Sequence, residues 1–162
     1  LATACREIRV HGQSGRYRHT RIGVGGRMDS IQCAVLLAKL ERFDWEVRRR
    51  AEIGARYGAL LAPAAKTIAV RPDRTSVYAQ YTIRVPDRAA FERSMKAAGI
   101  PTAVHYPLSL HQQPAYAAGF PGQSFPVSER LAREVISLPM HAYLEAPVHD
   151  RIIEAVRDAL KS

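Results

Sequence analysis

The sequence predicts an α+β fold, in which helices cover a few strands, preceded by a segment that looks like the end of a larger domain. Two observations carry this prediction: a long helical pattern over residues 29–62, and a strand-like segment, residues 77–85, that leads into a second helical pattern. The chain has 162 residues, 47% of them apolar, which suits one ordinary domain or one domain with a tail.

A short strand and a long loop are predicted before the long helix. Residues 6–10 alternate charged and apolar side chains, which predicts a short strand. Residues 11–27 hold five glycines among Arg, His and Tyr, and predict a long functional loop. Asp29 and Gln32 then have the spacing of a capping box. The helix that follows is roughly 45 Å long at ~1.5 Å per residue, as in helices that link domains or line oligomer interfaces.

Shorter elements are predicted after Pro63, where the long helix ends. Asp87 is positioned to cap one helix and Gly99 to end it. A loop rich in Pro, His and Tyr precedes Phe125. The predicted strands are 77–85 and 102–106, and the predicted helices are 87–98, 128–135 and 147–160.

Composition excludes several classes of protein. No apolar run approaches the ~20 residues of a membrane helix, and no signal segment opens the chain. Cys5 and Cys33 form neither a disulfide framework nor a zinc set, so we expect free buried thiols and a cytoplasmic protein. The net charge of +9 suits nucleic acid or phosphate-bearing ligands. Because 20 of the 24 basic residues are Arg and no dense basic run carries interleaved aromatic residues, nucleic-acid binding is the less favoured of the two.

Two segments could carry chemistry. Residues 23–27 (Gly-Val-Gly-Gly-Arg) precede a helix, where backbone amides and an arginine can bind an anion; on this signal alone, a flexible turn is the stronger interpretation. His105 and Tyr106 end a predicted strand and could project into a cleft, or equally be structural. A metal site is not expected, because His105 and His111 are six apart with no carboxylate nearby.

Taken together, the motifs resemble sugar aminotransferases of the DegT/DnrJ/StrS type. The stretch around His11, Tyr17, His19 and the Gly-rich segment resembles that family's HG…Y.H…G.N.R.D..QAA pattern. The remaining matching segments are residues 39–40, 48–50, 57, 80–81, 99–107, 110–116, 125–129 and 138–141. Within the family, the resemblance is to enzymes that aminate a UDP-linked 3-keto-uronic acid (UDP-2-acetamido-2-deoxy-3-oxo-glucuronate) in surface-polysaccharide synthesis.

The resemblance implies a cofactor, substrates and an assembly. Family members are homodimers that use pyridoxal 5'-phosphate (PLP), with fold type I, and move an amino group from glutamate to a nucleotide-linked keto-sugar. They are more than twice this length. The expected division is therefore 1–28, the end of the large PLP domain with an active-site loop; 29–62, the linking helix; and 63–162, the small domain.

The resemblance also implies site residues. Gly25 stands where the family commonly has an Asn that reaches the partner subunit's PLP phosphate, so Gly25 and Gly26 are expected to contact the cofactor through the backbone. Arg27, His105, Tyr106 and His19 are the expected substrate contacts, with Tyr17 and His111 as weaker candidates. The family's Schiff-base lysine would lie before Leu1, because none of the four lysines, Lys39, Lys66, Lys96 and Lys161, has a matching context.

Two alternatives stay open at this point. The chain could be a non-catalytic remnant that acts as a binding or regulatory module, or a nucleic-acid-binding protein. The first residue is Leu, which leads us to expect a processed product or a fragment. We expect these residues by themselves to be catalytically silent and poorly soluble, because the long helix would expose apolar faces.

Overall fold

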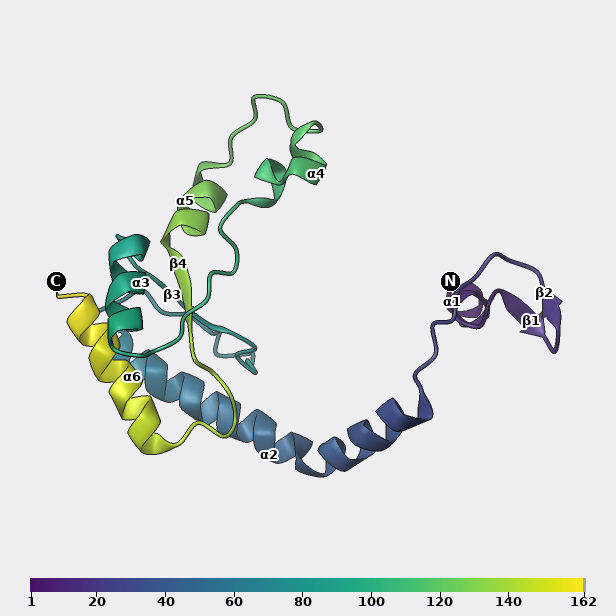
Figure 1. Ribbon diagram of the computed structural model, residues 1–162, viewed down its shortest axis with the longest axis horizontal. Helices are drawn as coiled ribbons and strands as arrows, with labels where there is room; N and C mark the ends of the chain where they lie inside the picture. Colours follow the sequence, from purple (N-terminus) through teal and green to yellow (C-terminus); the bar gives the residue numbers. More distant parts are fainter. Residues whose placement is uncertain (162) are drawn as a thin grey trace. The chain divides into compact units, whose positions relative to one another are not determined.

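The computed structural model describes residues 1–161, which divide into two compact units, Leu1–Asp44 and the residues from Trp45 onward. The predicted division at residues 28 and 62 stays a prediction. The first unit contains helix α1 (Ala2–Ile8) and an antiparallel hairpin of β1 (Gln13–Gly15) and β2 (Arg18–His19), followed by the beginning of α2 (Figure 1).

The predicted strand over residues 6–10 is wrong. Residues up to Ile8 belong to α1, and only Val10 forms a β-bridge, with Gly25. Ala2 and Ala4 favour a helix upstream of the alternating pattern, and five residues are too few to distinguish a period of 2 from one of 3.6. The predicted loop that follows contains the hairpin.

The long helix is confirmed as one continuous element, α2 (Ser30–Leu61), which crosses the boundary between the units. The Gln32 half of the capping box is present, since the Asp29 amide donates to Gln32 Oε1 at 3.2 Å. The buried positions of α2 are all near its C-terminal end: Ile53, Gly54, Tyr57 and Leu61. The earlier half exposes large apolar side chains at Ile31, Val35, Leu36, Leu37, Leu40 and Phe43.

The second unit is built on two antiparallel strands, β3 (Tyr81–Arg84) and β4 (Val135–Leu138), paired from Tyr81↔Leu138 to Arg84↔Val135. Its helices are α3 (Arg88–Ala97), the 3₁₀ turn η1 (Leu110–Gln112), α4 (Pro114–Ala117), α5 (Pro126–Glu134) and α6 (Ala146–Ala159). α3 packs beside α6 near the strand pair (Figure 1). The core joins the end of α2 to β3, β4, α3 and α6. Its central side chains are fully buried: Tyr57, Ile83, Met95, Ile136 and Val156.

Most predicted elements of this unit are confirmed, with shifted ends. Asp87 caps α3, accepting from the Ala90 amide at 2.9 Å. The predicted strand 77–85 shortens to β3, because Tyr78 takes a positive φ of 43° and its amide donates to Ser76 Oγ, which turns the chain. The predicted strand 102–106 reduces to one bridge between Ala103 and Ser137. β4 lies in a segment for which the sequence pattern predicted no strand.

The cysteines are free, but the expectation of buried thiols is wrong: Cys5 is exposed and Cys33 half-buried. Within residues 1–161, no helix combines the length and apolar character needed to cross a bilayer.

Candidate cofactor and substrate site

The Gly-rich segment of the first unit lies against residues 8–11 as an irregular ladder. His11 donates its amide to the Val24 carbonyl at 3.0 Å, and Gly26 donates to the Arg9 carbonyl at 2.8 Å. Val10 and Gly25 therefore face each other as a non-hydrogen-bonded pair. In such a pair the amide points away from the partner segment, so the Gly25 N–H is directed outward.

This geometry separates the roles open to the two candidate glycines. The Gly26 amide is already paired with Arg9, whereas the Gly25 amide can reach an anion without breaking the ladder. Arg27 follows directly and is exposed. The segment thus presents the Gly25 amide and the Arg27 guanidinium to solvent, and these two donors suit the oxygens of a phosphate.

Close backbone contact explains two glycines in this unit. A Cβ on Gly12 would lie 1.7 Å from the Arg21 carbonyl oxygen, and a Cβ on Gly23 would lie 2.2 Å from the Gly12 nitrogen. Gly12 also has a φ of +75°, which side-chain-bearing residues rarely adopt. The two glycines let the segment cross the start of the hairpin and so hold Gly25 and Arg27 in place.

The other candidates of this unit lie on the hairpin. His19 Nδ1 donates to the His11 carbonyl at 2.9 Å, which leaves Nε2 as the ring nitrogen available to a ligand. Tyr17 is 79% exposed, and the Arg16 guanidinium lies 5.2 Å from its ring centroid. Both side chains can meet a ligand that arrives from solvent.

In the second unit, His105 and Tyr106 are adjacent, with their rings edge-on at 5.7 Å. Tyr106 is 68% exposed, while His105 is half-buried and lines a cavity of about 210 Å³ together with Gln80, Ser137 and Met140. His105 Nδ1 lies 3.0 Å from Ser137 Oγ. The imidazole is thus held at one nitrogen, whereas the Tyr106 ring is largely exposed.

His111 has a carboxylate partner, which corrects the expectation that none is near. Its Nε2 lies 3.1 Å from Glu129 Oε1. The same oxygen accepts from the Phe125 amide at 2.7 Å and from Ser124 Oγ at 3.0 Å. The Phe125 amide, followed by Ser124 and His111, holds the pKa of Glu129 below its usual value. Glu129 therefore links His111, Ser124 and the Phe125 backbone to the start of α5, and a substrate contact by His111 stays a prediction.

No described lysine is suited to a Schiff base. All four lysines are exposed, and Lys161 donates to Asp158 Oδ1 at 2.9 Å. An imine-forming lysine needs a desolvated pocket that keeps its amine neutral. The lysines of residues 1–161 lack that setting in this structure, and the expectation that the cofactor lysine lies elsewhere stays a prediction. No group of three His, Cys, Asp or Glu residues within this range could hold a metal ion.

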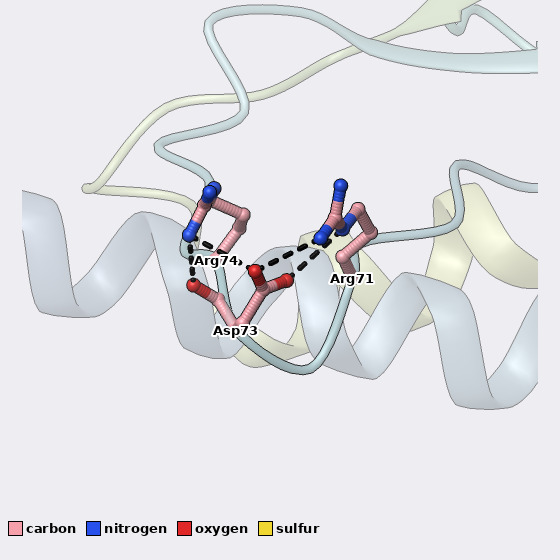
Figure 2. Close-up of polar contacts among 3 residues, drawn as sticks. All are labelled: Arg71, Asp73 and Arg74. Carbon is pink, nitrogen blue, oxygen red and sulfur yellow. Dashed lines mark hydrogen bonds and ion pairs between the residues drawn. The ribbon is translucent and has the colours of Figure 1, made fainter.

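Arg71 and Arg74 share one carboxylate partner, Asp73. Arg71 Nε and Nη2 each donate to Asp73 at 3.0 Å, and Arg74 donates to the Asp73 carbonyl at 2.8 Å (Figure 2). All three side chains are largely exposed, so this turn contributes little to stability. Because its carboxylate lies between the guanidinium groups, the turn is not an anion site comparable to Arg27.

The sequence matches one family model over most of its length. Residues 1–157 match the model of the DegT/DnrJ/EryC1/StrS aminotransferase family. The chain belongs to that family. This confirms the resemblance drawn from the motifs, and members of the DegT/DnrJ/EryC1/StrS family use PLP.

Curated relatives in the family share up to half of the residues. The chain is 47% identical over 146 residues to UDP-2-acetamido-2-deoxy-3-oxo-D-glucuronate aminotransferase of Pseudomonas aeruginosa, covering 90% of this chain and 40% of that protein. It is 37% identical over 161 residues to dTDP-3-amino-3,4,6-trideoxy-alpha-D-glucose transaminase of Streptomyces venezuelae, covering 98% of this chain and 42% of the relative. The chain thus spans less than half the length of these relatives.

Solved structures confirm the fold class. A family aminotransferase from Brucella abortus matches with a TM-score of 0.91 and 35% identity, over 99% of this chain and 44% of that one. DesV from S. venezuelae, in complex with a ketimine intermediate, matches with a TM-score of 0.92 and 35% identity over the same shares. The chain thus has the fold of the corresponding part of these fold-type-I aminotransferases.

The site candidates fall in two groups. Gly25, Gly26, Arg27 and His19 belong to the first unit, and the adjacent His105 and Tyr106 belong to the second. Sequence reasoning missed Ser137, which contacts His105, and Thr82, which contacts Ser137. Both are small polar residues within short strands, a pattern that carries no local signal.

Proposed function

We propose that this chain is the C-terminal portion of a PLP-dependent aminotransferase that moves an amino group, from glutamate, to a nucleotide-linked keto-sugar used in surface-polysaccharide synthesis. The 47% identity to the P. aeruginosa UDP-2-acetamido-2-deoxy-3-oxo-D-glucuronate aminotransferase is the observation that carries the proposal furthest. It favours a UDP-linked 3-keto-uronic acid as substrate. The family match favours this function over a non-catalytic binding or regulatory module.

In this proposal PLP, when bound, supplies the electron sink for amino transfer, and residues of this chain bind and orient. The Gly25 amide contacts the cofactor phosphate, across the interface of a cytoplasmic homodimer, and Gly26, whose amide donates to the Arg9 carbonyl, holds this segment in place. Arg27 binds an anionic group of the nucleotide-sugar, because a guanidinium fork suits phosphate and carboxylate. His105, Tyr106 and His19 contact the sugar side of the substrate.

The chain alone is inactive in this proposal, because its four lysines are exposed and none can attach the cofactor. A lysine outside residues 1–162 supplies that bond in the complete enzyme. The proposal therefore concerns the natural protein that contains these residues, and its activity is to be measured on that protein.

The test is amination of a UDP-linked 3-keto-uronic acid by glutamate, comparing the natural protein with Arg27→Ala. Losing a charge-assisted hydrogen bond of ~1.5–3 kcal/mol raises the KM for the nucleotide-sugar roughly ten- to a hundredfold. The matched control is Arg42→Ala, which removes an exposed arginine of the same unit and leaves KM unchanged.

Each outcome bears on a different part of the proposal. A wild-type protein that aminates only 4-keto-sugars contradicts the substrate class, and one that aminates no nucleotide-sugar contradicts the function. Equal KM values for Arg27→Ala and Arg42→Ala contradict the role of Arg27.

A further inference from the structure

Ser137 on β4 joins three segments of the second unit. Its backbone exchanges two hydrogen bonds with Ala103, from the Ser137 amide at 2.7 Å and back to the Ser137 carbonyl at 3.1 Å. Its Oγ lies 3.0 Å from His105 Nδ1 and 2.9 Å from Thr82 Oγ1 on β3. One residue thus holds the backbone that carries His105 and one nitrogen of its ring.

The partners of Ser137 are fixed by the strand register. Thr82 and Ser137 are directly opposed in the β3–β4 pair, so their side chains share one face of the sheet. Ser137 is only 4% exposed and Thr82 is half-buried. Water therefore competes weakly for these hydroxyls, and the line Thr82–Ser137–His105 forms within the protein.

This line leaves only Nε2 of His105 for a ligand. When Ser137 donates to Nδ1, the proton of the neutral ring is on Nε2, which donates to the ligand. When Nδ1–H donates to Ser137 Oγ instead, Ser137 donates to Thr82 Oγ1 and Nε2 accepts from the ligand. Rotation of the hydroxyls exchanges the two arrangements without moving the ring.

We propose that Thr82 and Ser137 are positioning residues that hold the His105 imidazole with Nε2 presented to the substrate. This inference rests on the proposed function, in which His105 contacts the nucleotide-linked keto-sugar. It adds two residues that do not themselves touch substrate, and it assigns a direction to the ring. Removing the Ser137 hydroxyl frees Nδ1 from its partner, so the ring can turn. Removing the Thr82 hydroxyl takes away the group that accepts from Ser137 when Nδ1 carries the proton, so the tautomer balance of the ring shifts.

The direct test is ¹⁵N NMR of the histidine rings in the natural protein, labelled at histidine, with His105→Gln identifying the signals. The expected result is that Ser137→Ala and Thr82→Val both change the His105 tautomer balance. Thr82→Ser, which keeps the hydroxyl, leaves it as in the wild type. Ser94→Ala, which removes a half-buried hydroxyl of α3, is the matched control and also leaves it unchanged.

Kinetics provide the second readout. Losing one neutral hydrogen bond lowers kcat/KM for amination roughly three- to tenfold in Ser137→Ala and Thr82→Val, while Thr82→Ser recovers the wild-type value. Unfolding is monitored by the thermal midpoint, and Thr82→Val keeps the volume and branching that suit a strand. This variant therefore tests the hydroxyl even if Ser137→Ala proves unstable.

The outcomes separate this inference from the proposed function. An unchanged His105 signal in Thr82→Val overturns the inference whatever the enzyme's activity. A changed signal with equal kcat/KM values for Thr82→Val and Thr82→Ser overturns it as well, since the orientation would then not serve the substrate. If the wild type aminates no nucleotide-sugar, the proposed function fails first, and the NMR result then reports on the hydroxyl line alone.

Discussion

His149 is a buried histidine in α6 that takes no part in the candidate site. It is 2% exposed, its Nε2 has no hydrogen-bond partner among the described residues, and its ring lies edge-on to Tyr57 at 4.1 Å. Burial, followed by the charge of Arg56, lowers the pKa of His149 to about 4. Tyr57 in turn stacks on Tyr81 at 4.7 Å, so the neutral ring is part of the aromatic core.

This pKa shift makes stability depend on pH in one direction. In the unfolded chain His149 has the ordinary histidine pKa of 6.5, and folding lowers this pKa to about 4. The stabilisation from this group is therefore complete above pH 6.5 and is lost as the pH falls toward 4. At 1.36 kcal/mol per pKa unit, the loss is about 3 kcal/mol.

The variant His149→Phe tests this dependence. It keeps an aromatic ring against Tyr57 and removes a nitrogen that has no partner, so we expect a smaller drop in the thermal midpoint between pH 7.5 and 5 than in the wild type. Differential scanning fluorimetry of the natural protein at both pH values measures it. The same drop in both proteins would show that His149 is not the group that titrates.

At the scale of an element, α2 carries two glycines whose environments differ. A Cβ on Gly54 would lie 2.4 Å from the Tyr78 ring, while a Cβ on Gly58 would meet only Tyr81 Oη at 3.6 Å. The Tyr78 backbone is held by Arg50, which donates to its carbonyl at 3.0 Å. Tyr78 therefore cannot move aside easily, and α2 approaches it closely only because residue 54 is Gly.

Alanine at these two positions is expected to act in opposite directions. Helix propensity alone favours Ala over Gly by about 1 kcal/mol at both positions. Gly58→Ala should therefore raise the thermal midpoint, whereas Gly54→Ala should lower it by overpacking against Tyr78, at a cost of about 1–3 kcal/mol. Thermal unfolding of both variants checks this; a higher midpoint for Gly54→Ala would contradict the packing seen here.

The helices were predictable because their signals are local. Asp87 as a cap, Pro63 as a stop and the spacing of apolar residues in α2 each act within a few residues. β4 was not predictable as a strand, since its four residues gain their pairing only from β3, some 50 positions earlier in the chain. A strand was wrongly predicted where α1 ends, because five alternating residues fit both the period of a strand and that of a helix.

The candidate site divides in the same way. Gly25, Gly26, Arg27, His105 and Tyr106 came from motif order along the chain, and their roles stay predictions. Ser137 and Thr82 could not be found without the strand register, and neither could Glu129, which lies 18 residues after His111 and yet contacts it. Contacts between distant segments are what the sequence alone could not show.

At the scale of the whole molecule, the earlier half of α2 exposes large apolar side chains around much of its circumference: Ile31, Val35, Leu36, Leu37, Leu40 and Phe43. Exposed apolar side chains of this kind mark a surface that another part of a protein covers. We therefore expect the 162-residue chain, produced alone, to associate as its concentration rises.

Sedimentation velocity over a range of concentrations measures this association. The double variant Leu37→Glu and Leu40→Glu should reduce it, while the matched double variant Glu41→Gln and Arg42→Gln, on the same helix, should not. A monodisperse wild-type monomer with a sharp cooperative melt would contradict the expectation.

The central claim is that these residues complete a PLP enzyme whose cofactor lysine lies elsewhere in the natural protein. The most direct measurement incubates that protein with PLP, reduces the imine with borohydride, and locates the pyridoxyl-lysine by peptide mass spectrometry. We predict a single modified lysine outside residues 1–162. Modification at Lys39, Lys66, Lys96 or Lys161, or no modified lysine at all, would contradict the account.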